Sequence, residues 1–145
     1  MLVGSARGME RYQEFLQALV TQLGLSDVVF TGHVSTAQLV AYYRCASVYL
    51  SMSEHEGFGV PLLESMHFGV PIVAYKAAAV PETLGSSGIL VTAKEHAAVA
   101  ELIGLLVEDA GLRAQIVARQ REQLQDFLPE KVEGRLRELL YSLGV

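Results

Sequence analysis

The sequence predicts an α/β fold, with a doubly wound parallel sheet and helices on both of its faces. Short runs of β-branched and aromatic residues alternate along the chain with stretches that are apolar at every third or fourth position. The length of 145 residues is typical of one domain. Hydrophobic residues make up 51% of the chain and charged residues 19%, which is enough apolar material for a substantial core.

The first part of the chain is expected to hold two strands and two helices. Residues 1–3 and 28–30 are short apolar runs that each end near a glycine, which is typical of strands. Residues 9–23 carry apolar side chains at helical spacing, which predicts an amphipathic helix. Ser35 or Thr36 is expected to cap a second helix, because a side-chain oxygen there can accept a hydrogen bond from a free helix N–H group.

The rest of the chain is expected to alternate in the same way and then become helical. Strands are predicted over 48–52, 71–75 and 88–91, with a helix entered at Pro61 and ended by Gly69, and a turn at Pro81. Three further helices are predicted over residues 95–108, 111–127 and 130–143. This order favours a Rossmann-like sheet in one domain, residues 1–145, in which residues 112–145 form a helical tail.

Composition excludes several classes of protein. With a net charge of −5, the chain lacks the excess of basic residues that a non-specific nucleic-acid binder shows. The single cysteine, Cys45, excludes a disulfide framework and a multi-cysteine zinc site. No apolar run reaches the roughly 18 residues of a membrane span. We therefore expect a cytoplasmic protein, with a peripheral membrane association through another domain left open.

Two glycines mark the loop between the predicted strand 48–52 and the next helix. Gly57 and Gly59 lack a Cβ atom, so a ligand can approach the backbone closely. The helix that follows presents unpaired N–H groups and a partial positive charge, which suits a phosphate or diphosphate. An ordinary strand-to-helix turn, with glycines for packing, explains the same local pattern equally well.

Two carboxylates flank these glycines. Glu56 opens the loop and Glu64 lies eight residues later, and a carboxylate suits the paired hydroxyls of a ribose or a sugar. The alternatives are a solvated loop acid for Glu56 and, for Glu64, a helix dipole interaction of about 0.3–1 kcal/mol. The run Glu54-His55-Glu56 could be mistaken for a metal site. Consecutive loop residues rarely all face one ion, so no metal site is predicted.

One stretch of the chain carries a specific resemblance to a known family, namely Glu56-Gly57-Phe58-Gly59-Val60-Pro61-Leu62-Leu63-Glu64. It resembles the motif of two glutamates separated by seven residues in the carboxyl-terminal, nucleotide-sugar-binding domain of retaining GT-B glycosyltransferases, in particular family 4, the glycosyl transferases group 1. Segments in the same order as in that family also match, namely Leu2 to Gly4, Leu23 to Val34, Gly69 to Ala74, Val80 to Glu82 and Gly88 to Val91.

The resemblance implies a role for each residue of the motif. Glu64 would hold the ribose hydroxyls of a nucleoside diphosphate sugar, of UDP or GDP type, and Glu56 would act as the catalytic residue beside the donor sugar. Gly57, Phe58, Gly59 and Val60 would contact the diphosphate or the sugar, and His33 with Val34 would lie against the base. The family needs no metal or other cofactor and transfers the sugar with retention of configuration.

The resemblance also implies missing parts. Nothing matches the family's basic diphosphate clamp, because the chain starts at what looks like its second strand. We therefore expect a fragment, lacking the first strand–helix unit and the amino-terminal acceptor domain, that is inactive alone. The open strand edges would then be paired between copies as a homo-oligomer, or by the missing segment.

Two other functions remain compatible with the predicted fold. One keeps the GT-B architecture with another reaction, a nucleotide-sugar epimerase or a phosphorylase, which the glutamate–glycine motif disfavours. The other is a non-catalytic nucleotide-binding or protein-interaction module. Since a fold alone does not define a function, the decision rests on the site.

Overall fold

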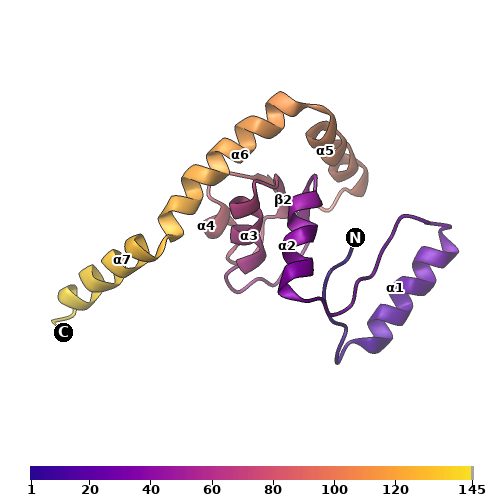
Figure 1. Cartoon of the computed structure of the whole chain (residues 1–145), viewed down its shortest axis with the longest axis horizontal. Coiled ribbons are helices and arrows are strands. Elements are labelled where there is room, and N and C mark those ends of the chain that lie inside the picture. Colours follow the sequence, from indigo (N-terminus) through magenta and orange to yellow (C-terminus); the bar gives the residue numbers. More distant parts are fainter. Residues whose placement is uncertain (145) are drawn as a thin grey trace. The chain divides into compact units, whose positions relative to one another are not determined.

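The computed structural model describes residues 1–144 and divides the chain into two compact units, Met1–Tyr42 and the residues from Tyr43 onward. The first unit contains α1 (Glu10–Gln22) and the start of α2 (Thr36–Cys45), and the second contains the sheet and the remaining helices (Figure 1).

The first unit pairs its two predicted strands only at one point. Leu2 and Phe30 form an isolated parallel bridge, in which the N–H of Leu2 donates to the oxygen of Val29 at 2.7 Å. The predicted strands 1–3 and 28–30 are therefore wrong in extent. Within this unit each run has only the other to pair with. Further backbone bonds run from the N–H of Thr31 to the oxygen of Leu2 at 3.0 Å and from the N–H of Gly4 to the oxygen of Gly32 at 3.3 Å, without forming a longer ladder.

The start of α2 confirms the predicted cap and assigns it to Ser35. The hydroxyl of Ser35 accepts a hydrogen bond from the N–H of Gln38 at 3.3 Å. The side-chain oxygen of Gln38 in turn accepts from the N–H of Ser35 at 2.9 Å. This reciprocal arrangement satisfies two backbone donors at the helix end.

The second unit is built on a parallel sheet of three strands, β1 (Tyr49–Ser51), β2 (Ile72–Tyr75) and β3 (Ile89–Val91), in that spatial order. The predicted α/β class with a parallel sheet is confirmed, and each strand is slightly shorter than the predicted 48–52, 71–75 and 88–91. Among residues 1–144, β1 has a strand neighbour only on the side of β2.

Helices cover both faces of this sheet. Ile72 and Ala74 of β2 pack with buried residues of α3 (Val60–Phe68) and α4 (Val80–Leu84). Val73, between them, points to the opposite face. There it packs with residues of α5 (His96–Glu108) and α6 (Ala110–Leu124). A central strand that is buried on both faces explains why residues 71–74 form a continuous apolar run.

The helix boundaries bring two corrections. Where a turn was predicted at Pro81, the chain forms the short helix α4, since proline suits a first helical turn. The predicted helix 111–127 begins at Ala110, because Asp109 caps it by accepting from the N–H of Leu112 at 2.8 Å, and it closes with a 3-10 turn, Gln125–Phe127.

The tail continues into α7 (Pro129–Ser142), close to the predicted 130–143. None of the α7 side chains is buried. Val145, the last residue of the predicted tail, lies outside the described residues. Within residues 1–144 no helix combines the length and the apolar character that crossing a membrane requires.

Candidate functional site

The loop between β1 and α3 lies at the carboxyl end of the parallel sheet. It contains two glycines, and the structure requires glycine at only one of these positions. Gly59 adopts the left-handed conformation, with φ 84°, and a Cβ atom there would come within 2.7 Å of the Leu62 Cδ1 atom. Gly59 is therefore required by the chain's own turn. Gly57 is not left-handed, and a Cβ atom there would meet nothing within 4 Å. At Gly57 the space is open to a ligand.

Helix α4 holds the carbonyl groups of this loop. The buried hydroxyl of Thr83 donates to the oxygen of Phe58 at 2.7 Å, and the N–H of Ala79 donates to the oxygen of Glu56 at 3.4 Å. The end of α6 supports this contact, since the side-chain amide of Gln123 donates to the oxygen of Thr83 at 3.3 Å. The carbonyl groups of Glu56 and Phe58 thus face the residues that pack behind the loop.

The amide groups of the same loop are left available. Within the described residues, the N–H groups of residues 57–60 have no hydrogen-bond acceptor. They stand at the N-terminus of α3, where the helix dipole contributes a partial positive charge. A row of free N–H groups at a helix N-terminus favours a phosphate or another anion.

The two glutamates belong to one polar environment. Glu64, half-buried, accepts a hydrogen bond from the Tyr43 hydroxyl at 2.8 Å. Burial, and then the bond to Glu64, raise the pKa of Tyr43 well above its usual value. Burial also raises the pKa of Tyr49, and the negative charges of Glu56 and, more weakly, Glu64 add to this effect. Both carboxylates therefore act on the first residue of β1.

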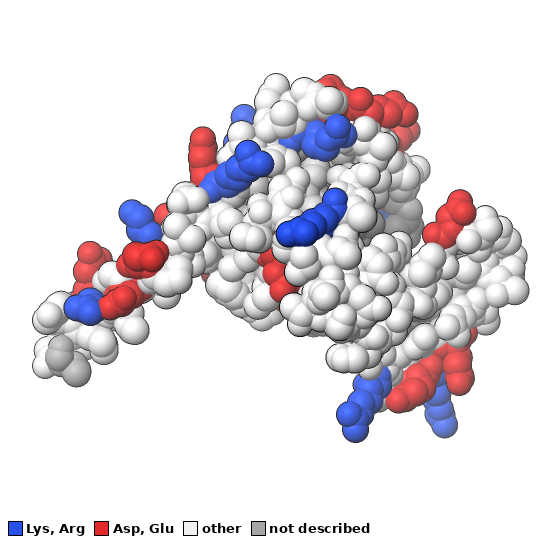
Figure 2. Space-filling view, in the orientation of Figure 1, with Lys and Arg blue, Asp and Glu red and all other residues white. Residues whose placement is uncertain are grey.

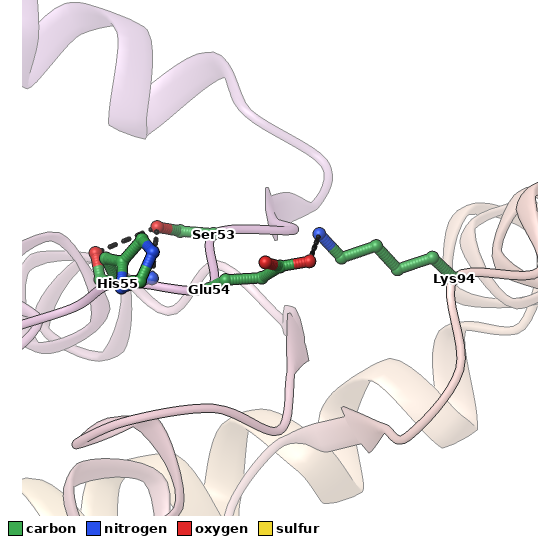
Figure 3. Close-up of polar contacts among 4 residues, drawn as sticks. All are labelled: Ser53, Glu54, His55 and Lys94. Carbon is green, nitrogen blue, oxygen red and sulfur yellow. Dashed lines mark hydrogen bonds and ion pairs between the residues drawn. The ribbon is translucent and has the colours of Figure 1, made fainter.

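A lysine that the sequence analysis missed lies at the same end of the sheet. Lys94, three residues after β3, forms an ion pair of 2.7 Å with Glu54, three residues after β1 (Figure 3). Its Nζ atom is also 4.9 Å from the centre of the Tyr75 ring, at the end of β2. The sequence could have indicated this pair, because Glu54 and Lys94 follow their strands by the same number of residues, and the carboxyl ends of parallel strands lie at one edge of the sheet.

The run Glu54-His55-Glu56 diverges in the structure. Glu54 turns to Lys94, and the backbone of His55 is bound by the Ser53 hydroxyl, at 2.9 Å from its oxygen and 3.3 Å from its nitrogen (Figure 3). Among residues 1–144 no three histidine, cysteine, aspartate or glutamate side chains are arranged to hold a metal ion.

The predicted site residues fall in both units. The second unit brings together Glu56, Gly57, Phe58, Gly59, Val60 and Glu64 around the start of α3. His33 and Val34 belong to the first unit, directly before the cap of α2, with His33 exposed and Val34 half-buried. Tyr43, Thr83 and Lys94 complete the surroundings of the loop, and none of them was predicted as a site residue.

Comparison with known proteins gives a consistent result. Residues 2–123 match the sequence profile of the family described as Glycosyl transferases group 1. The D-inositol 3-phosphate glycosyltransferase of Acidothermus cellulolyticus is 37% identical over 121 residues, which cover 81% of this chain and 27% of that protein. The MMP alpha-(1->4)-mannosyltransferase of Mycolicibacterium hassiacum is 38% identical over 91 residues, covering 62% of this chain and 22% of that protein.

A solved structure shows the same relationship in three dimensions. HepE of Anabaena, crystallised in complex with UDP and glucose, superposes with a TM-score of 0.81 at 30% identity, covering 97% of this chain and 40% of HepE. The matched residues span only about a quarter of the length of the two curated relatives, the D-inositol 3-phosphate glycosyltransferase and the mannosyltransferase.

Proposed function

Because the chain belongs to the glycosyl transferases group 1 family, we propose that it is the donor-binding half of a retaining, metal-independent glycosyltransferase. The enzyme would transfer a sugar from a nucleoside diphosphate to a hydroxyl group of an acceptor. The observation that carries this proposal is the loop of residues 56–60, whose carbonyls are held by α4 while its amides remain available.

The amides of residues 57–60 would bind the diphosphate. When the bond between the anomeric carbon and the diphosphate oxygen breaks, negative charge develops on the leaving group. Hydrogen-bond donors already fixed in position stabilise such a charge without having to reorganise. Thr83 and Ala79 supply that fixation from the opposite side of the loop.

The two glutamates would recognise hydroxyl groups. Tyr43 donates to the Oε2 atom of Glu64, so the Oε1 atom remains available to accept from the ribose hydroxyls. Glu56 stands on the other side of the glycines and would contact the donor sugar near the transferred carbon. His33 and Val34 would lie against the base. The crystals of HepE with UDP and glucose make UDP the first nucleotide to test.

The test is an NMR titration of the ¹⁵N-labelled chain with UDP, GDP and ADP, with and without attached sugars. We expect UDP to shift the amide signals of Gly57 and Gly59. The Glu64→Gln variant retains an oxygen that can accept from Tyr43 but lacks the charge, and it should weaken UDP binding about tenfold, as the loss of a charge-assisted hydrogen bond predicts.

Glu138→Gln is the matched control, because Glu138 lies on the exposed helix α7, and it should leave the UDP affinity unchanged. If no nucleotide shifts the signals of residues 57–60 at millimolar concentration, the proposal is wrong. The protein-interaction module would then be the better interpretation of this fold.

A further inference from the structure

A hollow in the second unit lies at the amino end of the sheet. Its volume is about 460 Å³, within the range of small-molecule sites. Ser47 at its wall precedes β1, and Val70 precedes β2, so this hollow is at the end of the strands opposite to the loop of residues 56–60. Its other walls come from the ends of α2, α3 and α5 and from the start of α6.

The charged side chains that line this hollow are both basic. Arg44 and Arg113 line it, and no acidic side chain does. The Nη2 atom of Arg121 is 3.8 Å from the position that a Cβ atom on Gly69, another lining residue, would occupy. Within residues 1–144, none of these three guanidinium groups lies within 4.0 Å of a carboxylate. Figure 2 shows basic side chains gathered over α6 and the end of α2, with little acidic surface among them.

One of the arginines is held in place by the backbone. The Nη1 atom of Arg113, which is half-buried, donates to the oxygens of Leu106 and Val107 at 3.0 Å and 2.9 Å. These are carbonyl groups of the last turns of α5. The N–H groups at Nη2 and Nε of Arg113 remain available to donate hydrogen bonds. A guanidinium group with a fixed orientation loses little entropy when it binds an anion.

We propose that this hollow is a binding site for a phosphate-bearing small molecule, held between Arg44 and Arg113. Arginine binds phosphate oxygens through two parallel hydrogen bonds, and within residues 1–144 neither Arg44 nor Arg113 has a carboxylate partner that would compete with the phosphate. A free phosphomonoester and a phospholipid headgroup share this chemistry. Neither arginine belongs to the proposed nucleotide site, although Tyr43, whose hydroxyl donates to Glu64 there, also lines this hollow.

Inorganic phosphate is the first probe, added at constant ionic strength to the ¹⁵N-labelled chain. We expect saturable shifts of the Gly69 and Val70 amide signals. Arg44→Gln should weaken this binding at least about fivefold, since it removes one charged donor pair. Arg113→Lys, which keeps the charge but loses the paired geometry, should weaken it as well. Arg137→Gln on α7 is the control and should bind phosphate like the original chain.

The positions of the shifts separate this proposal from the function proposed above. Phosphate that shifts only residues 57–60, or that binds the Arg44→Gln and Arg113→Lys variants unchanged, would overturn the proposal even if UDP binds as expected. Glucose 6-phosphate, and vesicles of phosphatidylcholine containing phosphatidic acid, then distinguish a soluble phosphomonoester from a headgroup. Shifts at Gly69 with either support the site, and absence of shifts with phosphate and with both of these probes overturns it.

Discussion

At the scale of single residues, Gly57 and Gly59 look alike in the sequence but have opposite structural roles. Gly59 is required by the backbone, since its left-handed conformation and the nearby Leu62 side chain leave no room for a Cβ atom. Gly57 is required by neither the conformation nor the packing. The turn therefore explains Gly59, whereas ligand access stays a prediction for Gly57.

Alanine substitutions should separate these roles. Gly59→Ala is expected to reduce the free energy of unfolding by about 1–2 kcal/mol, or about 3–6 °C in Tm, because an L-residue is strained at this conformation. Gly57→Ala should leave Tm nearly unchanged and weaken UDP binding. Thermal unfolding combined with the UDP titration checks both. A Gly57→Ala variant that melts early but binds UDP normally would contradict the assignment.

The spacing of Glu56 and Glu64 was visible in the sequence, but their partners were not. Tyr43 and Thr83 lie 21 and 25 residues away from the groups they bind. Which buried hydroxyl reaches which acceptor depends on how separate elements pack, and no local pattern in one sequence carries that information.

At the scale of elements, the loops that follow β1 and β3 are joined by the Glu54–Lys94 ion pair. The hydrogen bond from Lys94 holds the pKa of Glu54 below its usual value of 4.5. A lowered pKa in the folded chain means that the pair stabilises the fold at neutral pH and that this contribution disappears as the pH falls through the folded-state pKa of Glu54.

This ion pair gives a pH prediction. An NMR titration of the Glu54 carboxyl carbon should show a midpoint below 4.5 in the original chain. Lys94→Gln should return the midpoint to the usual value, since it removes the main cause of the shift. Because both side chains are substantially exposed, the effect on Tm should be small. An unchanged midpoint in Lys94→Gln would contradict the pairing.

Predictions for whole elements succeeded where a local signal was sufficient. Gly69 ends α3, as predicted, and adopts the left-handed conformation there, and Ser35 caps α2. The strands over 1–3 and 28–30 failed because a strand depends on a neighbour and not only on its own residues. Helix α4 was missed because five residues are too few to show a helical period.

At the scale of the whole molecule, the alternation of strands and helices was enough to predict the α/β class. The boundary between the two compact units falls inside α2, between Tyr42 and Tyr43, so no loop or change of composition marks it. The pairing of the open edge of β1, by a second copy or by another segment, stays a prediction.

Burial predicts how stability is distributed over the molecule. Ile72, Val73 and Ala74 of β2 are fully buried, whereas α1 and α7 have no buried residue. Hydrogen exchange should therefore be slowest at β2 and close to that of an unfolded chain in α1 and α7. Exchange followed by NMR measures this residue by residue. Amides of α1 that exchange as slowly as those of β2 would show that α1 is protected by contacts other than those described.

The contact between Phe58 and Phe127 has an optical consequence. The two rings meet edge to face, with centres 5.8 Å apart, where the 3-10 turn after α6 reaches the loop of residues 56–60. The chain contains no tryptophan. A tryptophan introduced at position 127 would thus be its only such fluorophore, placed directly against the loop, and its emission would record movements of Phe58 without any attached dye.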